Sequence, residues 1–251
     1  MALRVGVIGG GQLARMMIAP AVELGLDLRV LAEDEGMAAQ LAATEVGDYH
    51  DLEVVRAFVA DVDVVTFDHE HVPQQVLRAL VAEGVAVHPG PDALQFAQDK
   101  LLMRARLEEL GVPQPDWAPV RDASELQAFL DEHDGQGVVK TPRGGYDGKG
   151  VRVVRAASEA QDWLDGLADG EALLVEELVG FVRELAQQVA RRPSGQIVAY
   201  PVVETVQREG VCAEVIAPAP HATDRLAQVA EEIGRSIAEG LGVTGLSLIH
   251  I

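Results

Sequence analysis

The chain has 251 residues, and its hydrophobic content of 48% is typical of a protein that folds around a core. Forty acidic residues against twenty basic ones give a formal net charge of −20, which disfavours nucleic acid and anionic membranes as partners. No apolar run approaches the roughly 18 residues of a transmembrane helix, and no secretory pattern opens the chain. Cys212 is the only cysteine, which excludes an internal disulfide and favours a cytoplasmic location. We expect its thiol to be a small core group.

The first ninety residues alternate segments with strand-like and helix-like patterns. The expected strands are residues 4–8, 28–32, 62–67 and a last one within 85–91, and the expected helices are 12–24, 51–60 and 74–83. Repeated βα units of this length predict a parallel sheet with helices on both faces, and ligands bind such sheets beyond the carboxyl ends of the strands. In the first helix, Leu13, Met16 and Met17 recur at helical spacing, so we expect them in the core.

After residue 91 the pattern changes to α+β with antiparallel pairs. Residues 92–110 read as one helix, and Asp122 with Glu125 forms a capping box that opens another helix, to about residue 132. Strand-like segments and a long hairpin around residues 192–195 follow, and then an amphipathic helix over 223–239. The expected fold class is therefore α/β, with a Rossmann-like parallel sheet in a domain at 1–95 and an α+β domain at 96–251.

The opening stretch "VGVIGGGQLARM" reads as a strand, a glycine turn and the start of a helix. Gly9, Gly11 and Ala14 fit the loose dinucleotide pattern G-x-G-x-x-G/A, and Glu33 and Asp34 follow at about the expected distance. The bare amides of such a turn suit any phosphate. The pattern is therefore compatible with two interpretations: a nicotinamide or flavin site, or a phosphate site of another kind.

A second glycine-rich segment, "KTPRGGYDGKG", occupies residues 140–150 between two expected strands. Its glycines let the backbone approach an anion, and successive amides can cradle a phosphate. It is not a Walker loop, because Arg143 and Gly150 stand where that motif requires glycine and Ser or Thr. An ordinary hairpin turn is the alternative, but two residues would suffice for that.

Most of the basic residues in the chain are arginines. Only three of its twenty basic residues are lysines, namely Lys100, Lys140 and Lys149. Two of them lie in the glycine-rich segment, so these positions are candidates for a compact ammonium beside an anion.

Two acidic stretches are also candidates for binding. In "VEELVGFVRE", backbone groups at 177–179 could hydrogen-bond an adenine edge and Glu184 could accept from ribose hydroxyls, although solvated surface acids are the alternative. In "DHEH" (68–71) neighbouring side chains on a strand end point apart, so at most two could converge on a metal ion. Glu70 as a substrate-binding acid is the favoured interpretation.

Together these segments resemble the N5-carboxyaminoimidazole ribonucleotide synthase family of ATP-grasp ligases. The resemblance covers residue 4 to about residue 245 and implies a pre-ATP-grasp domain followed by an incomplete ATP-grasp domain whose lid spans about 117–177. It is carried by "GGGQLARM" (9–16), "TFDHEHVP" (66–73), "KTPRGGYDGKG" (140–150), "VEELVGFVREL" (175–185), "YPVVETVQREGV" (200–211) and "APAP" (217–220).

The resemblance also implies roles for individual residues. Those implied to bind ATP are Lys100, Lys140, Gly145, Tyr146, Asp147, Gly148, Lys149, Gly150, Val151, Glu176, Glu177, Leu178, Val179, Glu184 and Gln207. Those implied to bind the ribonucleotide are Gly10, Gly11, Gln12, Leu13 and Glu70. Tyr146, Asp147 and Lys149 are implied to be catalytic.

The implied reaction is phosphoryl transfer from MgATP to bicarbonate, which gives carboxyphosphate. The exocyclic amine of 5-aminoimidazole ribonucleotide then takes up the carboxyl group, in purine biosynthesis. Positioning and charge neutralisation carry most of such catalysis. The resemblance also implies a homodimer for the full-length family.

The end of the chain departs from the family pattern. After "GVTG" (242–245) the sequence "LSLIHI" differs, and no candidate metal acid follows Glu239. We therefore expect no Mg²⁺ ligands in this chain, which would be a truncated and inactive or nearly inactive fragment. The alternatives are another ATP-grasp ligase of the formate-dependent glycinamide ribonucleotide transformylase type, a dinucleotide oxidoreductase, or a non-catalytic nucleotide-binding fragment.

Overall fold

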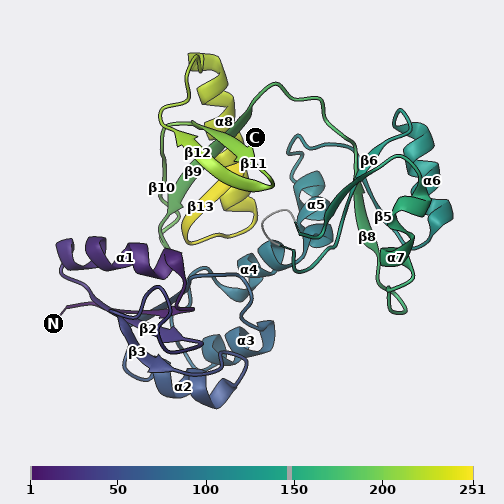
Figure 1. The fold of residues 1–251 in the computed structure, drawn as a ribbon. Coiled ribbons are helices and arrows are strands. Elements are labelled where there is room, and N and C mark those ends of the chain that lie inside the picture. Colours follow the sequence, from purple (N-terminus) through teal and green to yellow (C-terminus); the bar gives the residue numbers. More distant parts are fainter. Residues whose placement is uncertain (1, 146–148, 251) are drawn as a thin grey trace. The chain divides into compact units, whose positions relative to one another are not determined.

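The structure is a computed structural model that describes residues 2–145 and 149–250, with side chains up to residue 246 (Figure 1). The chain divides into two compact units. The first comprises Met1–Gln95 with Val243–Gly245, and the second comprises Phe96–Gly242 with Leu246–Ile251. Among the described residues, none of the helices has the length and apolar character needed to cross a membrane.

The first unit is built on a parallel sheet in the order β3-β2-β1-β4. Its strands are β1 Arg4–Ile8, β2 Asp27–Ala32, β3 Ala43–Val46 and β4 Val64–Phe67. Helices cover both faces: α1 (Gln12–Glu23) lies on one, and α2 (Leu52–Val59) and α3 (Gln74–Ala82) lie on the other (Figure 1). Alternation along β1 explains this arrangement, because Val7 packs with the α1 residue Ala14 while Ile8 packs with α2 and α3. The expected α/β class of this part is confirmed.

Three details of the first unit differ from expectation. Leu13 and Met16 are not core residues, since they are 58% and 69% exposed and α1 buries its small side chains Ala14 and Ala21 instead. The strand expected within 85–91 is reduced to a single parallel bridge between Val65 and Val87. Strand β3 was not expected, because its short sequence ATEV carries no apolar alternation.

The helix expected over 92–110 is two helices, α4 (Pro91–Gln98) and α5 (Lys100–Glu109). The break falls at Asp99, whose backbone is extended and whose carboxylate accepts hydrogen bonds from the amides of Leu101 and Leu102 at 3.0 and 3.1 Å. An aspartate that caps a helix start competes with continuing the preceding helix, so this break has a local cause.

The second unit contains an antiparallel sheet in the order β5-β8-β6-β7. Its strands are β5 Trp117–Val120, β6 Gly137–Lys140, β7 Val151–Val154 and β8 Leu173–Glu176. One face carries Val120, Val139 and Val175, which pack against Leu126 and Leu130 of α6 (Ala123–Glu132). The short helices η1 (Ala157–Ala160) and α7 (Gln161–Leu164) pack against the same core. The opposite face is therefore left for the polar residues at the strand ends.

A second sheet in this unit has the order β10-β9-β11-β12, with β13 also pairing with β9. Its strands are β9 Glu184–Arg191, β10 Ile197–Ala199, β11 Val203–Arg208, β12 Val211–Ile216 and β13 Gly245–His250. Helix α8 (Asp224–Gly240) packs on it closely, because a Cβ at Gly234 would lie only 2.9 Å from Cγ of Gln187. The expectation for Cys212 was wrong: it lies on β12, an outer strand whose residues are all exposed. The α+β character expected for this part is confirmed.

The C-terminal end of α6 is closed by His133. Its ring stacks on Phe129 with centroids 4.0 Å apart, its Nδ1 donates to the Phe129 carbonyl at 2.7 Å, and Nε2 lies 3.5 Å from Oδ2 of Asp116. The hydrogen bond to Phe129, followed by the one to Asp116, raises the pKa of His133 above its ordinary 6.5.

Because the folded state raises this pKa, His133 stabilises the fold when protonated, and that contribution is lost as pH rises through the folded-state pKa. We expect His133→Gln to lower the free energy of unfolding more at about pH 5.5 than at about pH 8.5. Urea unfolding at both pH values measures this difference. Equal losses at the two pH values would contradict it, and His221→Gln, at an exposed histidine, is the control.

Candidate functional site

The glycine-rich segment forms a loop between β6 and β7 with a closed neck. The Thr141 amide donates to the Gly150 carbonyl at 3.0 Å. Gly145 and Gly150 have φ of +78° and +76°, and a Cβ would lie 2.6 Å from the Lys149 oxygen in the first case and 2.5 Å from Oγ1 of Thr141 in the second. These two positions therefore require glycine. Tyr146, Asp147 and Gly148, assigned to catalysis and ATP binding from the sequence, lie outside the described residues.

Two of the three lysines bracket this loop. Lys100 is the first residue of α5, and its Nζ donates to the Gly144 carbonyl at 3.0 Å. Lys140 is the last residue of β6, directly before the loop. Lys149 is exposed within the loop, and Val151 begins β7. The structure thus brings Lys100, Lys140 and the described loop residues together.

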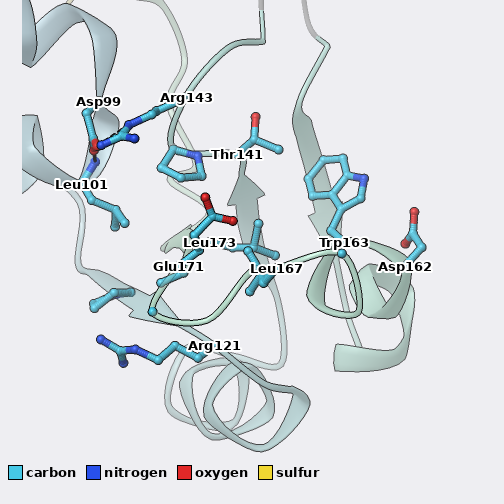
Figure 2. Close-up of a pocket in the computed structure, with 15 residues that line it drawn as sticks. Asp99, Leu101, Arg121, Thr141, Arg143, Asp162, Trp163, Leu167, Glu171 and Leu173 are labelled. Atoms are coloured by element: carbon cyan, nitrogen blue, oxygen red, sulfur yellow. Dashed lines mark hydrogen bonds and ion pairs between the residues drawn. The ribbon is translucent and has the colours of Figure 1, made fainter. Parts of the chain in front are cut away.

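Asp99 ties the start of α5 to the same loop. One carboxylate oxygen caps the helix, and the other accepts from Nε of Arg143 at 2.9 Å (Figure 2). The backbone adds a second link, because the Lys100 amide donates to the Pro142 carbonyl at 2.9 Å. Asp99 is 8% exposed. This role of Asp99 was not predicted from the sequence, although an aspartate directly before Lys100 is a recognisable helix-cap signal.

Glu176, at the end of β8, is a buried carboxylate held between two cations. Its Oε2 lies 2.5 Å from Nζ of Lys140, and its Oε1 lies 2.6 Å from Nε of Arg104 on α5. Burial raises the pKa of this carboxyl, but attraction to Lys140 and then Arg104, with their hydrogen bonds, outweighs burial and holds the pKa below its usual value. Glu176 is therefore charged at neutral pH. Arg104 was missed, because nothing in the sequence links residues 72 positions apart.

The expected adenine hinge after β8 is partly occupied by the chain's own hydrogen bonds. The Glu177 amide donates to the Asp116 carbonyl at 2.8 Å, and the Val179 carbonyl accepts from Phe181 at 3.1 Å. These two backbone groups therefore already have partners within the chain. An adenine contact would use the remaining backbone groups of the hinge, including those of the half-buried Leu178.

The second sheet brings Glu184 and Gln207, both assigned to the nucleotide from the sequence, into contact. Oε1 of Glu184, at the start of β9, accepts from Oγ1 of Thr205 at 2.6 Å and from Nε2 of Gln207 at 2.7 Å. Both donors come from β11. These contacts fix the orientation of the carboxylate at the end of the sheet.

In the first unit, two carboxylates lie against the opening glycine turn. Glu33 accepts from the Gly10 amide at 3.0 Å and from His69 at 3.1 Å, and Asp68 accepts from the Ala14 amide at 2.8 Å. A Cβ at Gly11 would lie 2.2 Å from Asp68. Burial raises the pKa of Glu33, but the Gly10 amide and then other hydrogen bonds outweigh it, so the pKa is lowered.

These contacts reduce the number of backbone amides that the expected anion site can offer to a ligand. The amides of Gly10 and Ala14 are taken, which leaves the helix start at Gly11, Gln12 and Leu13 for a ligand. Glu33, expected as the ribose partner of a dinucleotide, holds the turn instead, which counts against that interpretation. Glu70 is half-buried and follows β4, whose carboxyl end lies at the same sheet edge as that of β1.

Two further observations limit where ligands can bind. Among the residues that the structure describes, no three His, Cys, Asp or Glu side chains are grouped so as to hold a metal ion. A pocket of about 580 Å³ is lined by residues that include Leu101, Thr141, Trp163, Leu167 and Glu171, with Asp99 and Arg143 at one side (Figure 2). Lys140 and Glu176 are not among its described lining residues, whereas Thr141 and Arg143 of the glycine-rich segment are.

The site and fold agree with two family models. The ribonucleotide synthetase preATP-grasp domain matches residues 1–98, and the ATP-grasp domain matches residues 105–250. The chain belongs to the ATP-grasp family. The expected fold class and the ATP-grasp part of the resemblance stated from the sequence are thereby confirmed.

Several relatives of this ATP-grasp chain carry the same name. N5-carboxyaminoimidazole ribonucleotide synthase of Mycobacterium tuberculosis (strain H37Rv) is 48% identical over 98% of the chain and 58% of the relative. The enzyme of that name from Corynebacterium ammoniagenes is also 48% identical, over 98% of the chain and 60% of the relative. The chain therefore spans somewhat more than half the length of these proteins.

Solved structures show the same likeness. N5-carboxyaminoimidazole ribonucleotide synthetase from Thermus thermophilus matches with a TM-score of 0.88 and 31% identity, over 98% of this chain and 66% of that one. The Aspergillus clavatus enzyme in complex with ADP and 5-aminoimidazole ribonucleotide matches with a TM-score of 0.87 and 28% identity, over 99% and 65%.

The double role of Asp99 can be tested by proteolysis. We expect Asp99→Ala to speed tryptic cleavage after Arg143 several-fold, because it releases the arginine side chain and loosens the loop neck. Cleavage after Arg191, at the end of β9, serves as the internal control, and mass spectrometry separates the products. Equal acceleration at both sites would indicate general destabilisation and contradict the local role.

Proposed function

We propose that the chain is the ATP- and ribonucleotide-binding part of an enzyme that carboxylates 5-aminoimidazole ribonucleotide, using ATP and bicarbonate, in purine biosynthesis. The observation that carries the proposal is the placement of Lys100 and Lys140 at the two sides of a loop whose neck requires glycine. The names of the relatives, and the ligands named for the solved structures, support the same reaction.

On the nucleotide side, Lys100 and Lys140 would bind the phosphates of ATP. Two ammonium groups and a glycine loop suit an anion of high charge density. The hinge at 176–179 would bind the adenine through its remaining backbone groups, and Glu184, oriented by Gln207, would accept from the ribose. Tyr146, Asp147 and Lys149 would cover the reacting groups from the loop.

On the substrate side, the helix start at Gly11, Gln12 and Leu13 would bind the phosphate of the ribonucleotide. Amides at a helix N-terminus favour an anion. Glu70 would accept hydrogen bonds from the substrate at the same sheet edge.

Chemically, phosphorylation of bicarbonate by ATP would activate the carboxyl carbon for attack by the substrate's amine. The residues of this chain would contribute by positioning the phosphates, neutralising their charge and keeping water from the reacting groups. Mg²⁺ would enter with ATP, and among the described residues no three His, Cys, Asp or Glu side chains are grouped to hold it. Bicarbonate as co-substrate, a homodimer and a cytoplasmic location belong to the same proposal.

The proposal predicts tight ATP binding that depends on two lysines. In calorimetric titrations with MgATP, we expect Lys100→Met and Lys140→Met to weaken binding by about 10- to 100-fold each, the loss typical of a hydrogen bond to a charged group. Arg155→Met, which removes an exposed cation away from the loop, is the matched control and should bind as the unchanged chain does.

Two results would contradict the proposal. One is failure of the unchanged chain to bind MgATP. The other is binding of NAD⁺ in competition with 5-aminoimidazole ribonucleotide at the opening glycine turn, which would favour a dinucleotide site.

A further inference from the structure

Glu176 is a buried carboxylate that contacts two positively charged side chains. Its side chain is only 5% exposed, and each carboxylate oxygen has its own cation: Lys140 on Oε2 and Arg104 on Oε1. Lys140 and Glu176 lie on the same face of the sheet, because Lys140 pairs with Leu174, two residues before Glu176. Two cations therefore share one buried anion.

A buried carboxylate must keep a partner, because an isolated charge in a protein interior is strongly unfavourable. If Lys140 were the only partner, binding a phosphate would require it to serve two anions. Its positive charge would then be divided between Glu176 and the ligand. A second cation on Glu176 removes this conflict.

We propose that Arg104 is a positioning residue for the nucleotide: it carries the charge of Glu176, so that the ammonium of Lys140 can face a phosphate. This inference rests on the proposed function, which places the phosphates of ATP at Lys140. Arg104 would not touch the nucleotide itself and would act through Glu176 and Lys140.

The chemistry of the two cations suits these two roles, in which Arg104 pairs with Glu176 and Lys140 binds a phosphate. Arg104 lies on a helix and is linked to Gln114 at two points, one through its planar guanidinium and one through its backbone carbonyl. Nη1 is 3.5 Å from Oε1 of Gln114, and the Gln114 side-chain amide donates to the Arg104 carbonyl at 3.1 Å. Lys140 instead has a compact ammonium on a flexible stem with three donors, so it can turn part of its hydrogen bonding to a ligand. The fixed cation stays with the protein and the flexible one serves the ligand.

The test is a double-mutant cycle on Arg104 and Glu176, with MgATP and adenosine as the two probes. Arg104→Met keeps the apolar stem and removes the charge, Arg104→Lys keeps a charge, and Glu176→Gln removes the buried anion. Dissociation constants are measured for the unchanged chain, these single variants and the double variant R104M/E176Q, each checked for folding by circular dichroism.

We expect R104M to weaken MgATP binding about tenfold or more, the loss of one hydrogen bond to a charged group, and to leave adenosine binding within about twofold. R104K should recover most of the loss. The double variant should bind MgATP as E176Q does, because Arg104 is dispensable once Glu176 is neutral. The comparison of R104M/E176Q with E176Q tests the positioning role of Arg104 even if R104M alone does not fold.

Equal losses for MgATP and adenosine in R104M would show a general structural role and overturn the inference. So would a double variant that binds MgATP about tenfold more weakly than E176Q, the loss expected of a direct contact to a charged ligand. If the unchanged chain bound no ATP, the proposed function would fail and this inference with it, whereas ATP binding without the coupling would overturn the inference alone.

Discussion

The candidate nucleotide site depends on one interaction, the buried carboxylate of Glu176 between Lys140 and Arg104. It joins the end of β8, the end of β6 and helix α5, which are the three elements that carry the expected phosphate and adenine contacts. Because a buried carboxylate is strongly stabilised by its cations, this interaction holds the three elements in one arrangement. The glycine loop and Lys100 are then placed by Asp99, directly before the same helix.

The first unit uses carboxylates differently. Glu33 and Asp68 accept from amides of the opening turn and so reduce the number of donors that it offers to an anion. What remains at residues 11–13 suits a single phosphate group better than the pyrophosphate of a dinucleotide, which spreads over more of such a turn. The local pattern of glycines is thus shared with dinucleotide sites, whereas the neighbouring acids distinguish this turn from them.

Much of the fold could be predicted from the sequence, because the βα alternation, the Asp122 cap and the hairpin around 192–195 are local signals. The errors have local or tertiary causes. Asp99 splits a helix that apolar spacing would continue, and α1 buries alanines rather than Leu13 and Met16 because small side chains face its sheet. In the candidate site, the lysines and Glu176 could be predicted because each has a suitable chemical group and stands in a motif that the sequence shows. Arg104 was not, since its contact with Glu176 exists only once α5 lies beside the end of β8.

The link through Asp99 also has a consequence for motion. The Asp99 carboxylate accepts from the first turn of α5 through Oδ1 and from Arg143 at the loop neck through Oδ2, so a movement of Asp99 disturbs the hydrogen bonds of both segments. Amide hydrogens at the start of α5 and at the neck will therefore exchange with solvent as one cooperative unit. If the loop binds a ligand as proposed, exchange at both places will slow together, and the start of α5 will report on binding at the loop.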